Sequence, residues 1–327
     1  MITFDFEKPL VEHEKKIAEL RAYAKEAHID VSPELASLER KRDQLCAEIY
    51  ANLTPYQKVL VARHPNRPYT LDYVRLMCQD FLELHGDRRF ADDLAMVGGF
   101  ATIAGRRIVL IGHQKGRDTK ENLKRNFGMA HPEGYRKALR LMELADRCRL
   151  PIVTFIDTPG AYPGIGAEER GQAEAIAVNL REMIGLGVPI ICIVIGEGGS
   201  GGALGIGVGN RVLILEHAYY SVISPEGCAA ILFHDSSRNQ EAANALKLTA
   251  QDLLSFGIVE EIIPEPLGGA HRNHEQAAAL VKDAILRHLD QLASLSPDQL
   301  REQRYQKYRA VGVFTEAQQL LAHPAPS

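Results

Sequence analysis

The segment from Ile195 to Ala203 reads Ile-Gly-Glu-Gly-Gly-Ser-Gly-Gly-Ala and holds the residues best suited to chemistry. Glycines let a backbone approach a ligand closely, because no Cβ stands between the amide N–H groups and the ligand. Amides aimed in this way stabilise a developing oxyanion, and the N-terminus of a following helix would add a positive partial charge. The segment therefore predicts an oxyanion hole. A tight turn that binds nothing is the alternative.

Dinucleotide binding is a second interpretation of the same segment. Gly196, Gly198 and Gly201 fit the pattern G-x-G-x-x-G, and Glu216 falls near the place of a ribose-binding acid. Three further glycines within 205–209 speak against it, because they interrupt the helix that should follow.

A serine nucleophile is the third interpretation, since Ser200 lies in a G-x-S-x-G pattern between a strand and a helix. A serine hydrolase also needs a histidine and an acid. His217, His234 and His271 follow in the chain, although a sequence with 12 histidines offers such partners by chance.

A second loop, Ile156 to Gly164, follows another apolar run and has similar character. Pro159 and Pro163 stiffen it, and Gly160 is expected to leave its amide accessible. A purely structural strand-to-helix loop is the alternative.

The stretch 106–125 is strongly basic. It contains seven lysines and arginines against Asp118 and Glu121, a local net charge of +5 in a chain of net charge -4. Lys120, Lys124 and Arg125 could attract the phosphate groups of a ligand or an acidic partner. A solvated surface is the alternative.

These loops need a scaffold, and the apolar pattern predicts one. Residues 95–103 and 107–113 read as a β-hairpin joined by Ala104-Gly105-Arg106. Continuous apolar strands then alternate with helices, as in an α/β core covered on both faces. The strands are expected at 151–156, 188–195, 212–215, 219–223 and 258–263, and the helices at 135–147, 169–186, 225–233 and 248–256.

The two ends of the chain read as helical. Two amphipathic helices are expected within 9–50, the second opened by Ser32 as N-cap and Pro33. Short helices are expected in 52–90. Asn273 and Ser296-Pro297 open two more helices, and the tail with Pro324 and Pro326 is expected to be disordered.

Composition limits the remaining choices. The 327 residues are 46% hydrophobic and 24% charged, which suits a globular protein with a sizeable core. The five cysteines form no C-x-x-C pair, so we expect no metal site and a reducing cytoplasm. The first residues resemble no signal peptide, and the longest apolar run, 188–195, is too short to span a membrane. No nucleic acid is expected as a partner.

Taken together, these segments resemble the alpha subunit of bacterial acetyl-CoA carboxylase carboxyltransferase. The similarity spans about residues 4–310 in the right order. The blocks that carry it are 68–73, 112–117, 125–129, 132–138, 155–164, 166–172, 196–203, 221–228 and 263–273.

The resemblance implies an α/β, crotonase-like spiral of ββα units with N-terminal and C-terminal helical extensions. It divides the chain into a helical hairpin (1–51), a connecting segment (52–94), a carboxyltransferase core (95–265) and C-terminal helices with a tail (266–327). It implies transfer of a carboxyl group from carboxybiotin to acetyl-CoA, which gives malonyl-CoA for fatty acid synthesis.

The implied partners are a carboxyltransferase beta subunit in an α2β2 assembly, a biotin carboxyl carrier protein that bears the biotin covalently, and an ATP-using biotin carboxylase. The beta subunit of this family carries a four-cysteine zinc ribbon and its own oxyanion hole for acyl-CoA. This chain lacks those cysteines and is expected to hold no metal.

The resemblance also assigns a site. Gly201 and Gly202 are the expected catalytic donors to the biotin oxyanion, and Gly198, Gly199, Gly160 and Ala161 complete the carboxybiotin site. Two alternatives stay open: a serine hydrolase that uses Ser200, and a crotonase-like binding module without catalysis.

Overall fold

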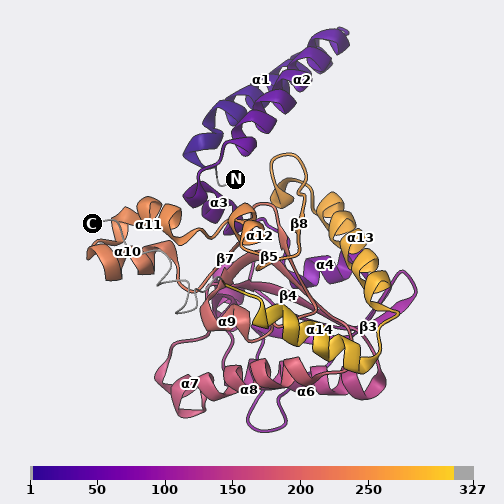
Figure 1. Cartoon of the computed structure of the whole chain (residues 1–327). Helices are drawn as coiled ribbons and strands as arrows, with labels where there is room; N and C mark the ends of the chain where they lie inside the picture. Colours follow the sequence, from indigo (N-terminus) through magenta and orange to yellow (C-terminus); the bar gives the residue numbers. More distant parts are fainter. Residues whose placement is uncertain (1–2, 313–327) are drawn as a thin grey trace, which may run out of the picture.

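A single mixed sheet organises the protein in a computed structural model that describes residues 3–312 (Figure 1). Its strand order is β1-β2-β3-β4-β5-β6-β8, and β7 pairs with the end of β5. The tail with Pro324 and Pro326 lies outside the described residues.

The predicted hairpin is present as β2 (Met96–Ile103) and β3 (Arg106–His113), which pair antiparallel. Its turn residues Ala104 and Gly105 have φ of 50° and 77°, the left-handed pair that matches the twist of a two-residue hairpin turn. A short edge strand, β1 (Asp80–Glu83), pairs with β2. The sequence did not predict β1 because it is brief and only half buried.

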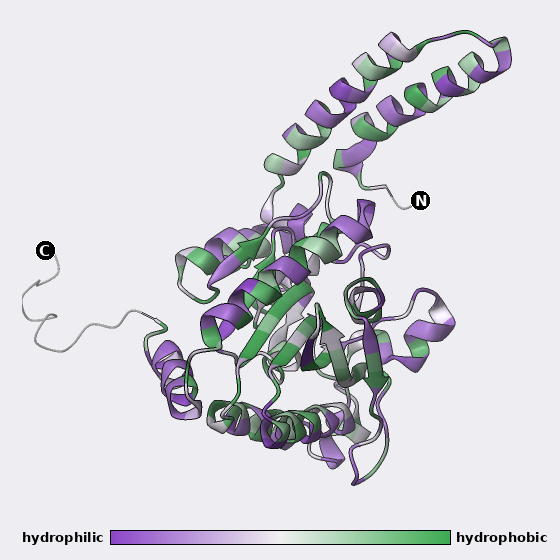
Figure 2. Ribbon diagram, turned by 90° about the vertical axis from the view of Figure 1, so that its right-hand side faces the viewer, coloured by the Kyte–Doolittle hydropathy of each residue, from purple (hydrophilic) through white to green (hydrophobic). Residues whose placement is uncertain are grey.

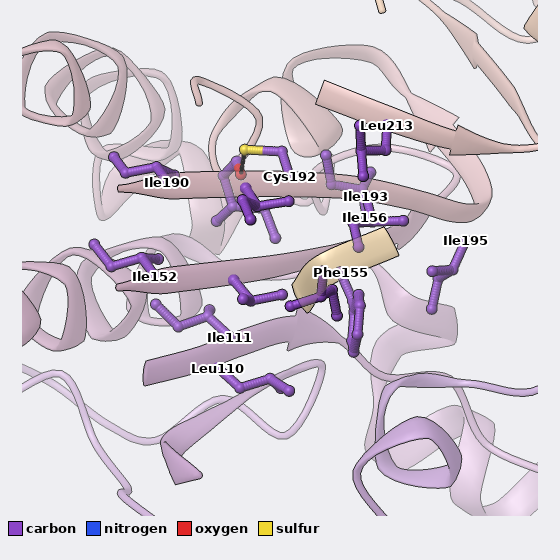
Figure 3. Packing of buried hydrophobic residues seen from close by; sticks show 14 of the residues in the cluster. Leu110, Ile111, Ile152, Phe155, Ile156, Ile190, Cys192, Ile193, Ile195 and Leu213 are labelled. Carbon is purple, nitrogen blue, oxygen red and sulfur yellow. Dashed lines mark hydrogen bonds between the residues drawn. The ribbon is translucent and has the colours of Figure 1, made fainter. Parts of the chain in front are cut away.

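The remaining strands of the main path run parallel: β4 (Ile152–Thr158), β5 (Ile190–Gly199), β6 (Arg211–Leu215) and β8 (Glu261–Ile263). The start of β5 pairs with β6, and its end pairs with β7 (Tyr219–Ser221). The prediction that β5 stops at Ile195 was wrong, because the strand continues through the glycines to Gly199. Residues such as Phe155, Ile193 and Leu213 fill the core between strands and helices (Figure 3).

Helices cover both faces of the sheet. A Cβ on Gly98 would touch Leu141 of α6 (Pro132–Cys148), whereas one on Gly112 would touch Thr70 of α4 (Thr70–Met77). Gly98 pairs with Ile111, so Gly112 points to the opposite face. Beside α6 lies α8 (Gln172–Gly185), with α14 (Pro297–Arg309) against it, while α13 (His274–Leu292) packs beside α4.

Helix caps follow the predicted signals at three places. Ser224, Asn273 and Ser296 each accept a hydrogen bond from the backbone N–H three residues on. They open α10 (Pro225–Phe233), α13 and α14. Ser32 is different, because it is the first helical residue and its hydroxyl donates to Asp30 instead of capping the helix.

The N-terminal hairpin, α1 (Lys8–Ala27) and α2 (Ser32–Ala51), projects from the body (Figure 1). It mixes hydrophilic and hydrophobic residues, whereas the strands are mostly hydrophobic (Figure 2). Its base is held by Tyr50, whose hydroxyl donates to Glu7 at 2.8 Å, and by Arg272, which contacts Glu14 at 2.7 Å. The shorter helices are α3 (Pro55–Ala62), α5 (Thr119–Lys124), α7 (Ile165–Glu169), α9 (Ser200–Leu204), α11 (Asn239–Leu246) and α12 (Ala250–Ser255).

Candidate functional site

Two loops meet at the carboxyl ends of β4 and β5. A Cβ built on Gly202 would stand 2.4 Å from the backbone nitrogen of Ala161 and from the backbone carbon of Gly160. One built on Gly199 would stand 2.2 Å from the carbonyl oxygen of Pro159. Glycine is therefore required at positions 199 and 202 because another backbone passes there. The two loops therefore pack directly against each other.

The backbone of the glycine loop turns at Ser200, which has a φ of 56°. Gly201 and Gly202 are not among the residues with positive φ. Both lie in the first turn of α9, so their N–H groups have no acceptor inside the helix. Within residues 3–312 we find no other hydrogen bond to these two N–H groups. The helix has only five residues, so the expected help from its dipole is small.

A cavity of about 500 Å³ opens beside this loop. Ser200 and Gly201 line it, and the nearest atom to a Cβ on Gly201 would be the Ile176 side chain at 3.7 Å. Gly201 is therefore accessible while Gly202 is packed. The rest of the lining is largely apolar and includes Leu204, Tyr220, Val222, Leu253, Ile258 and Tyr308.

The other residues predicted to contact carboxybiotin have backbone roles. Gly198 pairs with Thr158 and Tyr220, and Gly199 pairs with Ser221, so both belong to the sheet. The amide of Gly160 is not accessible as expected, because it donates to the Thr158 hydroxyl at 3.1 Å. The contact of these residues and of Ala161 with carboxybiotin stays a prediction.

A buried charge cluster lies at the ends of β4 and β5, where the two loops begin. Lys115 Nζ contacts Asp157 Oδ1 and Glu197 Oε2, each at 2.7 Å, and Arg63 Nε contacts Glu197 Oε1 at 2.7 Å. Burial alone would raise the pKa of Glu197, but Lys115 and Arg63 outweigh burial and lower that pKa to about 2. Sequence reasoning missed this cluster, because it counted Lys115 among the surface charges. The glutamate inside the glycine segment was the available signal.

His113 lies under the same loops and is fully buried. Its pKa is lowered to about 3, mainly by burial and then by the charge of Lys115. The imidazole is therefore neutral at pH 7. Its Nδ1 accepts the backbone N–H of Asp157 at 3.4 Å, so His113 supports the end of β4.

The hydrolase interpretation lacks a base. No histidine within residues 3–312 forms a hydrogen bond with Ser200. The residue shares with a nucleophile elbow only its left-handed φ and its place between a strand, β5, and a helix, α9. The dinucleotide interpretation fails for another reason: Gly196 and Gly198 lie inside β5, and α9 ends at Leu204.

The basic stretch divides into internal and exposed side chains. Arg106 pairs with Asp290, Arg117 with Asp72, and Lys115 is in the buried cluster. Arg125 pairs with Glu121 at 3.0 Å and donates to the carbonyl of Leu94 at 2.8 Å. Lys120 and Lys124 are exposed on α5. Their role, and that of Arg125, toward phosphate stays a prediction.

The described part of the chain shows no group of three or more histidines, cysteines or acids that could hold a metal ion. All five cysteines are free thiols. None of the described helices has the length and apolar character needed to cross a membrane.

A family model described as acetyl co-enzyme A carboxylase carboxyltransferase-like matches residues 3–312. The acetyl-coenzyme A carboxylase carboxyl transferase subunit alpha of Synechococcus elongatus is 59% identical over 316 residues, 97% of each chain. The protein of the same name from Geobacter metallireducens is 59% identical over 312 residues, 95% of this chain and 98% of its own.

Solved structures with a similar fold include transcarboxylase 12S, with a TM-score of 0.57 and 20% identity. The alignment covers 70% of this chain and 42% of that one, so the present chain spans less than half of its length. A Pseudomonas malonate decarboxylase hetero-tetramer in complex with coenzyme A has a TM-score of 0.54 and 17% identity, over 66% of this chain and 86% of its own. The crotonase-like α/β fold implied by the resemblance is confirmed.

Proposed function

The chain belongs to the acetyl co-enzyme A carboxylase carboxyltransferase-like family, and on this premise we propose that its glycine loop stabilises the oxyanion of biotin during carboxyl transfer. The chain is the alpha subunit of the carboxyltransferase, which transfers a carboxyl group to acetyl-CoA and yields malonyl-CoA. The role of individual residues is our proposal.

The observation that carries the proposal is that the N–H groups of Gly201 and Gly202 have no acceptor within the described residues, and that Gly201 lines an apolar cavity. Carboxybiotin supplies the carboxyl group, and its ureido oxygen becomes negative as that group leaves. In this proposal the two amides donate to that oxygen, and the apolar lining accommodates the rest of the biotin ring system. A preorganised donor of this kind commonly contributes about 3 kcal/mol.

The remaining parts of the site hold the donors and exclude water. Gly202 is packed against Gly160 and Ala161, which fixes one wall of the site. The apolar lining near Gly201 lowers the local dielectric constant, which strengthens each hydrogen bond to a developing charge. The residues predicted to meet the ligand are Gly198, Gly199, Gly201, Gly202, Gly160 and Ala161.

Acetyl-CoA also needs an oxyanion hole, and we assign that one to the beta subunit. The assembly is α2β2, and it works with a biotin carboxyl carrier protein and an ATP-using biotin carboxylase. Lys120 and Lys124 on α5 are exposed and suited to the phosphates of coenzyme A, with Arg125 held nearby by Glu121. The free cysteines fit a reducing cytoplasm.

A direct test is to express the chain with a beta subunit, purify the complex and measure malonyl-CoA decarboxylation with free biotin. The proposal predicts activity that needs both subunits and biotin. Activity of the chain alone, or turnover that ignores biotin, would instead support a hydrolase. A complex that binds its ligands without turnover would support a non-catalytic module.

A further inference from the structure

Three neighbouring strands end in one buried ion cluster, which we name the strand-end cluster: Lys115, Asp157 and Glu197. Lys115 lies two residues past β3, Asp157 lies in β4 and Glu197 in β5. Their side chains are 12%, 2% and 8% exposed, and the Lys115 ammonium contacts both carboxylates at 2.7 Å. One ammonium group thus bridges the ends of two adjacent strands.

The cluster also bonds directly to the backbone that leads into the glycine loop. The N–H of Glu197 donates to Asp157 Oδ1 at 3.0 Å, next to the place where the β4–β5 register shifts between Ile156 and Thr158. A Cβ on Gly196 would stand 2.5 Å from the same Asp157 oxygen. The carboxylate therefore occupies the gap that the irregular register leaves between the two strands.

Chain distances from the cluster to the proposed site are short. Gly160 comes three residues after Asp157, and Gly201 comes four residues after Glu197. Because so few residues separate the cluster from the loops, we expect a change in the distance between Asp157 and Glu197 to alter the packing of Gly202. That packing is against Gly160 and Ala161. Bound geometry matters strongly in catalysis, because a misplacement of about 1 Å can cost about 10²-fold in rate.

The cluster extends toward the surface through Arg63 and Glu226, whose side chains are partly exposed. Arg63, after α3, contacts Glu197 at 2.7 Å and Glu226 at 2.8 Å, and the Tyr219 hydroxyl donates to Glu197 at 2.9 Å. Glu226 lies in the first turn of α10. Every oxygen of Glu197 therefore has a described partner, so the carboxylate is oriented rather than available as a base.

We propose that Lys115, Asp157 and Glu197 are positioning residues for carboxyl transfer, which hold the ends of β4 and β5 at the separation that aims the Gly201 and Gly202 amides. This inference rests on the proposed function of the glycine loop. In this role the three side chains do not contact the substrate. Their effect is expected on turnover and not on the binding of the coenzyme A substrate.

The test compares four variants of the chain, each assembled with its beta subunit, in biotin-dependent malonyl-CoA decarboxylation. Lys115→Met keeps the length of the stem and removes the charge. We expect kcat to fall by about 10²-fold while KM for malonyl-CoA stays unchanged. Lys137→Met is the matched control. Lys137 lies on α6 and is 1% exposed, and its ammonium contacts Asp92 at 2.5 Å and the carbonyl of Asp93, neither of which belongs to the two loops. It should lower Tm and leave kcat unchanged.

A double variant separates positioning from stability. Lys115→Met combined with Asp157→Asn removes one charge of each sign, so Tm should recover relative to Lys115→Met while kcat stays low. Recovery of kcat together with Tm would overturn the inference, because a purely structural role predicts it. Glu197→Gln, which keeps the shape of the side chain, replaces Lys115→Met if the latter does not assemble, with the same expected loss of kcat.

Gly201→Val, which completes the set of four with Lys115→Met (or its substitute Glu197→Gln), Lys137→Met and the double variant, distinguishes this inference from the proposed function. If Gly201→Val loses turnover and the strand-end variants keep theirs, only the positioning role is wrong. If Gly201→Val itself turns over normally, the assignment of the glycine loop is wrong whatever the strand-end variants do.

Discussion

A Cβ on Gly202 would stand 2.4 Å from the backbone nitrogen of Ala161, so these two residues set how closely the loop after β5 approaches the loop after β4. Any side chain at position 202 must separate the loops. Gly201 has no such constraint, since its nearest neighbour would be a side-chain atom of Ile176 at 3.7 Å. Position 202 therefore needs glycine so that the two loops can pack together, whereas glycine at position 201 leaves the backbone accessible from the cavity.

Replacement of Ser200 tests the hydrolase alternative. Because Ser200 has a φ of 56°, Ser200→Gly should be tolerated fully. Ser200→Ala should lose at most about tenfold in activity, since a non-glycine residue already occupies this conformation. Steady-state kinetics of the assembled enzyme checks both. A loss approaching about a million-fold, as on removal of a true nucleophile, or labelling of Ser200 by a fluorophosphonate, would contradict the oxyanion assignment.

Charge reversal on α5 tests the phosphate assignment. Lys120→Glu with Lys124→Glu should raise the apparent KM for acetyl-CoA and weaken its dependence on salt, because a long-range attraction is lost. Lys25→Glu with Lys41→Glu, on the projecting hairpin, makes the same charge change elsewhere and is the control. An unchanged KM at low ionic strength in the α5 variant would leave Lys120 and Lys124 as ordinary solvated residues.

The assembly prediction follows from the subunit nature of the family. Light scattering on the chain co-expressed with a beta subunit should give the mass of an α2β2 particle. Exposed apolar side chains such as Ile231 and Leu232, 65% and 64% accessible, fit a chain that is partly covered by partners. A stable αβ pair at working concentrations would contradict this prediction.

Acid should destabilise the folded protein through His271, whose ring stacks on the ring of His64 with the centroids 4.1 Å apart. Burial, and next the charge of His64, lower the pKa of His271 to about 3. The unfolded chain binds this proton near pH 6.5, so the free energy of unfolding falls as pH drops from about 6.5 toward 3. His271→Gln should reduce that slope by up to about 1.4 kcal/mol per pH unit.

Denaturant unfolding at a series of pH values measures this slope. His28→Asn, at the exposed left-handed end of α1, is the control for the loss of a histidine as such. An identical slope in His271→Gln and the unchanged protein would show that His271 titrates alike in the folded and unfolded chains.

Local signals in the sequence were enough for much of the fold. The caps at Ser224, Asn273 and Ser296 were predicted correctly because a cap depends on a few neighbouring residues. The hairpin was also predicted, since its strands are adjacent in the chain, although Arg106, expected in the turn, is the first residue of β3. These features need no knowledge of distant contacts.

The end of β5 could not be predicted in the same way. Glycine is a poor strand residue, so a glycine-rich segment favours a turn. The segment is extended because Gly199 lies against Pro159 and Gly198 pairs with Thr158, contacts between residues about 40 positions apart. The burial of Lys115 is hidden for the same reason, since both carboxylates that neutralise it come from other strands.

The most direct test of the oxyanion assignment is kcat of the Gly201→Val enzyme, assembled with its beta subunit, in biotin-dependent malonyl-CoA decarboxylation. A Cβ at position 201 would have the Ile176 side chain as its nearest neighbour, at 3.7 Å, so we expect a Val side chain there to be accommodated and to block access from the cavity to the Gly201 amide. We expect a loss of about 10²-fold or more, as for one oxyanion donor, with acetyl-CoA binding and α2β2 assembly preserved. Gly202→Val should lose at least as much, through separation of the loops. An assembled Gly201→Val enzyme with normal kcat would contradict the proposed function of this loop.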